Sequence, residues 1–241
     1  KKNVTVTFTY DDIEGAEYIH EYDTIYLRDV KGYEDDGTTE EGGLLLFVVK
    51  ADETNIKCQA INPPTTGLAI PADLPENLAL SALDVAGAPA QTAKLVKPGD
   101  TVVIIGAGGK SGMLCCYEAK KRAGVTGKVI GICHSERSTK RMMDLGFCDE
   151  VFSADATQPV PVMKKIEELT NGQMADVCIN NVNIPDTEMT SILVTKNTGV
   201  VYFFSMATSF TKAALGAEGV GSDVTMIVGN GYTKGHAEIT L

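Results

Sequence analysis

The chain has 241 residues, of which 44% are hydrophobic, so it can bury a sizeable core as one large domain or two small ones. Its net charge of −11 argues against a nucleic acid or an anionic membrane surface as a partner. No apolar run is long enough to span a bilayer and no signal peptide is visible, so we expect a cytoplasmic protein with no membrane partner.

Residues 1–67 predict a small acidic β-rich unit. Alternation of apolar residues with threonine over 4–9 is typical of a half-buried strand, and further strands are expected at 25–27, 44–50 and 56–61. Twelve acidic and only two basic residues lie between Asp11 and Glu41, including an acidic loop over 34–43. We interpret these acids as a solvated face, with a cation or basic partner as the alternative. A proline-rich linker begins at Asn62.

Residues 68–241 predict an α/β domain of the Rossmann type, which is a doubly wound parallel sheet. A helical pattern over 76–96 is interrupted near Gly87 and Pro89. Strands are then expected at 102–105, 128–133, 150–152, 175–180, 200–204 and 224–228. The helices expected between and after them cover 113–123, 135–145, 161–170 and 185–194, with one more from about 233.

A glycine-rich turn follows the first strand of this domain, and a helix follows the turn. This order is typical of a dinucleotide site, where bare backbone and free helix N–H groups approach the pyrophosphate. The glycines can be read as Gly-x-Gly from Gly106, or as Gly-x-x-Gly-x-x-Gly ending at Gly112, and a turn without a ligand is the alternative. The spacing does not fit a phosphate-binding P-loop. The predicted cofactor-binding residues here are Gly106, Gly108, Gly109, Lys110, Ser111 and Gly112.

Further cofactor contacts are expected where later strands end. After the second strand, Ser135, Arg137 and Arg141 could hold the 2′-phosphate of NADP, whereas Glu136 could reach the ribose of NAD. The choice between NAD and NADP therefore stays open. The residues of this segment that we assign to the cofactor site are His134, Ser135 and Arg137. Polar residues after the fourth and fifth strands also face the expected crevice, and the ones assigned to the cofactor are Asn181 and Ser205.

Three ionisable residues are candidates for a catalytic proton acceptor. A long loop of small residues is predicted from Ser205 through Gly219, and it carries Lys212 and Glu218. Asp84, in a mostly apolar helix, is the third candidate. Residues such as Lys212 and Glu218 are more often simply surface charges.

The six cysteines form no Cys-x-x-Cys pair and lie mostly in apolar patterns, so they predict reduced core thiols. With only three histidines, the sequence predicts no metal site.

Several longer segments carry a family resemblance that covers about residues 68–241. LPENLALSALDVAGAPAQTAKLVKPGDT, followed by VVIIGAGGKSG, resembles the cofactor domain of medium-chain dehydrogenase/reductases. GKSGMLCCYEAKKR, PDTEMTSIL and YFFSMATSFTKAALGAEGVGSDVTMIVGNGYTKGHA are similar to the L-erythro-3,5-diaminohexanoate dehydrogenases of lysine fermentation. Residues 1–67 do not resemble the larger N-terminal catalytic domain of these enzymes.

The resemblance implies NAD(P)-dependent oxidative deamination of a small diamino acid, L-erythro-3,5-diaminohexanoate, to 5-amino-3-oxohexanoate and ammonia. It also implies a general base and a possible homodimer. A nucleotide-binding module without a complete catalytic domain is the alternative, and an interaction protein with an acidic partner surface is a third hypothesis.

Overall fold

The computed structural model describes residues 5–9, 24–28, 43–51, 55–60, 74–229 and 233–241. The chain divides into two compact units, Lys1–Ala69 and Ile70–Leu241. Most of the predicted acidic loop and the start of the proline-rich linker lie outside the described residues.

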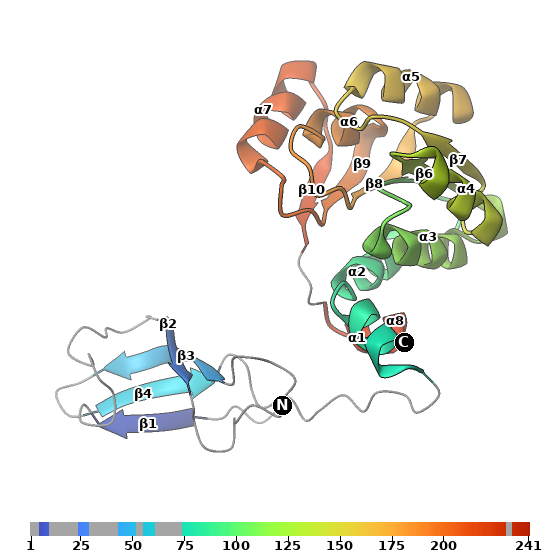
Figure 1. Cartoon of the computed structure of the whole chain (residues 1–241). Helices are drawn as coiled ribbons and strands as arrows, with labels where there is room; N and C mark the ends of the chain where they lie inside the picture. The colour runs from blue at the N-terminus through green and yellow to red at the C-terminus, as the bar shows by residue number, and fades with distance from the viewer. Residues whose placement is uncertain (1–4, 10–23, 29–42, 52–54, 61–73, 230–232) are drawn as a thin grey trace. The chain divides into compact units, whose positions relative to one another are not determined.

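The first unit contains a four-stranded antiparallel sheet in the order β1-β4-β3-β2 (Figure 1). Its strands are β1 (Thr5–Thr9), β2 (Thr24–Arg28), β3 (Gly43–Ala51) and β4 (Asn55–Ala60). Ile56 is fully buried, whereas Thr7 on β1 is exposed, as expected of strands with one face against a core. The predicted antiparallel β unit is confirmed.

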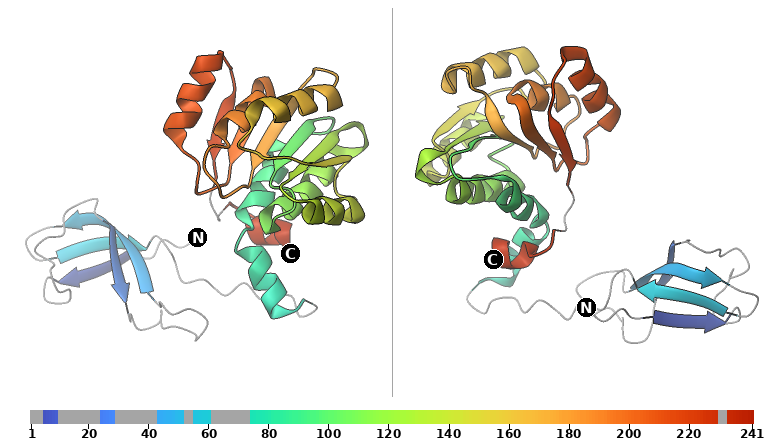
Figure 2. Two further views of the ribbon diagram at one scale, coloured as in Figure 1. Left: turned by 45° about the horizontal axis from the view of Figure 1, so that its top comes forward. Right: turned by 180° about the vertical axis from the view of Figure 1, so that it is seen from behind.

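The second unit is built on a six-stranded sheet whose strands are all parallel. The spatial order is β10-β9-β8-β5-β6-β7, so the direction of winding reverses between β5 and β8 (Figure 2). The strands are β5 (Thr101–Ile105), β6 (Lys128–Cys133), β7 (Glu150–Ser153), β8 (Ala175–Asn180), β9 (Thr195–Phe203) and β10 (Thr225–Val228). The predicted doubly wound sheet is confirmed, and such sheets bind ligands where the winding reverses.

Helices cover both faces of this sheet (Figure 1). One face packs against α2 (Gly87–Leu95), α3 (Lys110–Ala123) and α4 (Glu136–Leu145), and the other against α5 (Pro159–Leu169), α6 (Glu188–Leu193) and α7 (Phe210–Val220). Short helices α1 (Glu76–Leu83) and α8 (His236–Thr240) pack together beside α2. Residues 102–105 of β5 are completely buried because both faces of the strand are covered.

Several predicted boundaries differ from the structure, and the largest difference is at β9, which begins at Thr195 rather than at residue 200. Helix α3 begins at Lys110, three residues before the predicted start, and α6 begins at Glu188 rather than Pro185. The break in the first helical region lies at residues 84–86, and Gly87 and Pro89 belong to the first turn of α2, where proline needs no intrahelical donor.

The predicted long loop through residues 216–219 is wrong, because these residues form most of the second half of α7. Ser209 caps this helix by accepting a hydrogen bond from the Lys212 amide at 3.3 Å. Gly216 faces α6, and a Cβ at this position would lie 2.4 Å from the Met189 sulfur. The glycine that suggested a loop is therefore a packing contact between two helices.

Candidate dinucleotide-binding site

The turn after β5 gives separate structural roles to its glycines. Gly106 has a left-handed φ of 84°, and Gly112 fits so closely that a Cβ there would lie 2.1 Å from the Gly106 carbonyl oxygen. Gly109 begins α3 without a side-chain cap, and a Cβ on it would meet nothing closer than 3.4 Å. The structure thus favours the Gly-x-x-Gly-x-x-Gly spacing, in which Gly112 is closely packed and Gly109 is the glycine with open space beside it.

Gly108 serves a different contact. A Cβ at this position would lie 2.6 Å from the Ser138 Cβ, so the glycine lets α4 pack against the turn. Arg141, one helical turn further along α4, donates a hydrogen bond to the Gly108 carbonyl. The turn is thereby fixed to α4 as well as to α3.

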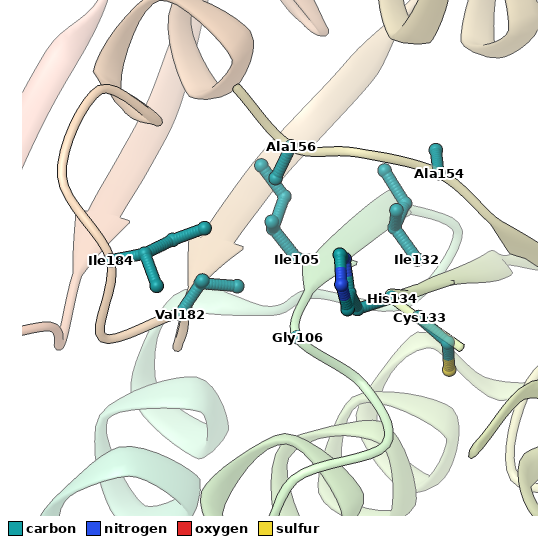
Figure 3. Close-up of a pocket in the computed structure, with 9 residues that line it drawn as sticks. All are labelled: Ile105, Gly106, Ile132, Cys133, His134, Ala154, Ala156, Val182 and Ile184. Carbon is teal, nitrogen blue, oxygen red and sulfur yellow. The ribbon is translucent and has the colours of Figure 1, made fainter. Parts of the chain in front are cut away.

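An apolar pocket of about 260 Å³ opens beside this turn, at the carboxyl ends of the strands (Figure 3). Gly106 forms one wall, and the ring of His134 stands beside it. Side chains from β5, β6 and the segments after β7 and β8 complete the lining, namely Ile105, Ile132, Cys133, Ala154, Ala156, Val182 and Ile184. A flat, largely apolar group such as a purine ring suits this lining.

The first turn of α4 lies next to the pocket. Ser135 caps the helix, and its hydroxyl lies 2.9 Å from the hydroxyl of Ser138 in a capping box. Glu136 and Arg137 are both exposed in the same turn. Two of the three groups predicted to hold a 2′-phosphate, Ser135 and Arg141, therefore already have protein partners.

Two predicted site residues from different elements meet at the start of α3. The ammonium of Lys110 lies 2.6 Å from the Asp84 carboxylate, which follows α1. Both side chains are well exposed. Ser111, next to Lys110, is half-buried. Asp84 is therefore an ion-pair partner of a predicted cofactor ligand.

The end of β8 carries a buried polar network. Asn180 is fully buried and donates to the hydroxyls of Thr187 and Ser191, both at 2.9 Å, which fastens the start of α6 to the strand. The Asn181 amide donates to the Ile105 carbonyl at 3.0 Å, across the point where the winding reverses. The side-chain nitrogen of Asn181 is buried without a partner among the described residues.

The remaining candidates follow β9. Ser205 accepts a hydrogen bond from the Ala207 amide at 3.0 Å, so it shapes the segment after the strand. Lys212 is exposed and paired with Asp186, which raises the pKa of Lys212 above its usual value. Glu218 is exposed further along α7. No described contact joins either residue to the glycine-rich turn.

Burial suppresses the ionisation of two of the cysteine thiols. Cys115, Cys116, Cys133, Cys148 and Cys178 are all free thiols. Desolvation raises the pKa of both Cys115 and Cys178 to about 12, so neither thiol ionises near neutral pH.

Some features of the site carried no clear sequence signal. The alanines and isoleucines that line the pocket are ordinary core residues, and only their position after a strand end could have drawn attention to them. Glu188 was also missed, although it is a nearly completely buried carboxylate close to the end of β8.

Comparisons with known proteins support the sequence resemblance. Residues 111–220 match the model of the zinc-binding dehydrogenase family. Over 172 residues, the chain is 64% identical to an L-erythro-3,5-diaminohexanoate dehydrogenase of Acetoanaerobium sticklandii, covering 71% of this chain and 50% of the relative. Over 191 residues, it is 56% identical to an enzyme of the same name from Fusobacterium nucleatum, and the match covers 79% of this chain and 55% of that relative. The chain thus spans about half the length of these relatives, and the predicted resemblance is confirmed.

Solved structures show the same fold at low sequence identity. The structure of an alcohol dehydrogenase from Aeropyrum pernix superposes on this one with a TM-score of 0.56 at 19% sequence identity. The match covers 80% of this chain and 56% of the alcohol dehydrogenase chain. The structure titled AibC has the same TM-score at 22% identity, over 71% of this chain and 50% of its own.

Two observations bear on metals and membranes. Among the described residues, no three His, Cys, Asp or Glu side chains are grouped to hold a metal ion. These residues therefore do not provide a ligand set for the zinc that appears in the name of the matching family. Within the same part of the chain, no helix combines the length and apolar character needed to cross a membrane.

Proposed function

We propose that this chain forms the coenzyme-binding part of an NAD(P)-dependent dehydrogenase that deaminates L-erythro-3,5-diaminohexanoate. The observation that carries the proposal is its 64% identity over 172 residues to an enzyme of that name. The glycine-rich turn supports it, because the turn is closed by packing at Gly112 and left open at Gly109. Since the chain covers half of that relative, the activity of the whole enzyme is an inference from the relative.

The residues present fit a dinucleotide. Bare backbone at Gly109 and the first N–H groups of α3 would approach the pyrophosphate, with Lys110 adding positive charge. The pocket beside Gly106 would take the adenine and exclude water from it. Asp84 would orient Lys110 through their ion pair.

A bound nicotinamide coenzyme would supply the acceptor for the hydride that leaves the amine-bearing carbon of the substrate. Water then supplies the new carbonyl oxygen and ammonia leaves, so a group on the protein must accept a proton. Of the three predicted proton acceptors, Lys212 is the poorest. Its hydrogen bond to Asp186 raises its pKa and keeps the ammonium protonated at neutral pH.

The arrangement after β6 favours NAD over NADP. The Ser135 hydroxyl is used in the capping box and the Arg141 guanidinium is used on Gly108. Binding a 2′-phosphate with these groups would break existing hydrogen bonds, and Glu136 in the same turn would repel the phosphate. Of the predicted phosphate ligands, Arg137 is the one that makes no hydrogen bond or ion pair with another described residue, and it is exposed.

Titration of the chain with NADH and NADPH, followed by fluorescence, tests this proposal. We expect saturable binding of both, with NADH the tighter. Oxidised coenzyme and L-erythro-3,5-diaminohexanoate are then added, and reduced nicotinamide and ammonia are measured. Binding with no turnover would favour the alternative of a nucleotide-binding module, and absence of any binding would refute the proposal.

A further inference from the structure

Glu188 is an unusual residue for its position. It begins α6, and the residue is only 2% exposed, although a carboxylate is among the groups that proteins bury least. A buried carboxylate is stable only where hydrogen bonds or opposite charges replace water. The partners of Glu188 therefore indicate what the residue does.

The main partner is the backbone of the segment after β9. One carboxylate oxygen of Glu188 accepts a hydrogen bond from the Ser209 amide at 2.6 Å. Ser209 is the residue that caps α7, so the contact fixes the point where the segment after β9 becomes a helix. A charged acceptor makes this hydrogen bond stronger than one between two neutral groups.

Glu188 is itself held in place from β8. The buried Asn180 at the end of β8 donates to Thr187 and Ser191, which flank Glu188 in the first turn of α6. The contacts therefore run from the end of β8, through α6, to the segment that follows β9. A second tie, the ion pair of Asp186 with Lys212, joins the same two segments at the surface.

These two segments lie at the carboxyl ends of β8 and β9. In a doubly wound sheet, the two halves on either side of the reversal each receive one mononucleotide. Seven of the nine residues that line the apolar pocket belong to the β5 to β7 half, and the other two, Val182 and Ile184, follow β8. The pocket therefore lies mainly on the β5 to β7 half, and we assign the second nucleotide to the half formed by β8, β9 and β10.

Resting on the proposed function, we infer that Glu188 is a positioning residue that holds residues 204–209 against the nicotinamide end of the coenzyme. The carboxylate does not touch the coenzyme in this assignment. It acts through the Ser209 amide, and its loss should weaken binding of the nicotinamide half while leaving the adenosine half intact.

The test compares Glu188→Ala and Glu188→Gln with the wild-type chain and with Glu118→Ala. Glu118 is an equally buried carboxylate with a hydrogen bond of 2.6 Å, but its partner is Arg122 on α3, so it is a matched control. Binding of NADH is measured by fluorescence and binding of AMP by calorimetry. Amide hydrogen exchange of residues 204–212 is measured without ligand.

For Glu188→Ala, we expect faster exchange at residues 204–212 and NADH binding weakened by about tenfold, with AMP binding unchanged. Glu188→Gln keeps an oxygen acceptor, but a neutral one, so it should weaken NADH binding by less than Glu188→Ala, again with AMP binding unchanged. If Glu188→Ala does not fold, this smaller loss, confined to NADH, is the result that tests the inference. Glu118→Ala should leave both affinities unchanged.

Equal losses of NADH and AMP binding in the Glu188 variants, unchanged exchange at residues 204–212, or the same NADH loss in Glu118→Ala would each overturn the inference. Failure of the wild-type chain to bind either nucleotide would instead refute the proposed function. The exchange experiment needs no nucleotide, so the two failures are distinguishable.

Discussion

Replacing Gly112 by alanine tests the close contact on which the shape of the glycine-rich turn depends. The new Cβ would lie 2.1 Å from the Gly106 oxygen, 2.8 Å from its carbonyl carbon and 2.9 Å from the Ala107 Cα. All three atoms belong to the backbone, so no side chain can rotate away. Since ordinary contact begins at 3.4 Å, the start of α3 must move away from the turn by more than 1 Å.

Two opposing effects determine the size of the loss. Overpacking of this kind costs up to about 3 kcal/mol, because the neighbours are backbone atoms. Alanine in place of glycine within a helix returns about 1 kcal/mol. The net destabilisation is therefore about 2 kcal/mol, which for a unit of this size lowers the melting temperature by roughly 4–8 °C.

Thermal unfolding followed by circular dichroism measures this loss, and NADH titration measures its effect on binding. Gly219→Ala is the control, because this glycine is also helical and a Cβ on it would meet nothing within 4 Å. The control should melt at the wild-type temperature or up to roughly 4 °C above it. If Gly112→Ala melts like the control and binds NADH normally, the close contact between turn and helix is refuted.

Two further predictions concern other parts of the larger unit. Gly109→Ala should change stability by less than about 1 kcal/mol, because its Cβ meets only the Gly106 oxygen at 3.4 Å. It should nevertheless weaken NADH binding by about tenfold, measured by titration. Unchanged affinity would contradict the proposal that the bare backbone at Gly109 approaches the pyrophosphate. Desolvation raises the pKa of Asp149, but hydrogen bonds from Lys120 and the Val129 amide lower it by a larger amount. The pKa of Asp149 is therefore below its usual value. The stabilisation from Asp149 is therefore present above the unfolded pKa of about 3.9 and is lost as the pH falls through the lower folded pKa. Asp149→Asn should lose at most about 1 kcal/mol in urea unfolding at neutral pH, and a difference that persists unchanged in acid would contradict this reasoning.

The sequence predicted the sheet well for a physical reason. Residues 128–133 and 175–180 are short, mainly apolar runs that end at polar or turn residues, and both match observed strands at their ends. A strand buried on two faces is mainly apolar, so the limits of these two strands are visible in the sequence. The first part of β9, at residues 195–199, is mostly polar and exposed, and its start was therefore missed.

The error over α7 has the opposite cause. Gly216 and Gly219 lower the helix propensity of the segment, and a local reading therefore favours a loop. The helix forms because Ser209 caps it and because Gly216 packs against Met189 of another helix. That second contact is tertiary, so no local pattern could show it.

The candidate site was predictable only in part. The glycine-rich turn lies within one stretch of chain, and its spacing could be read directly. The pocket joins residues from four strand ends, and Ala154 and Ile184 become neighbours only through the crossovers. Glu188 gave no signal because an acidic residue in the first turn of a helix is ordinary, whereas its burial depends on the fold.

The two halves of the crevice differ in polarity, and this difference suggests the orientation of the coenzyme. The pocket, which has seven of its nine lining residues on the β5 to β7 half, is almost entirely apolar. Three buried polar atoms without a partner among the described residues all lie on the other half, namely Asn181 Nδ2, Tyr202 OH and Thr208 Oγ1. Burying the carboxamide of nicotinamide in the apolar pocket would cost it hydrogen bonds, so the adenine is the better occupant there.

Tyr202→Phe tests whether these polar atoms are truly unpartnered in the ligand-free protein. Tyr202 is completely buried, and burial raises the pKa of its hydroxyl, which stays protonated. Removing an unpaired buried hydroxyl removes an uncompensated polar group, so the variant should be more stable by up to about 1 kcal/mol in urea unfolding. A variant less stable than the wild type would mean that the hydroxyl already has a partner in the free protein, and the reasoning from an unpaired buried group would then fail for Tyr202.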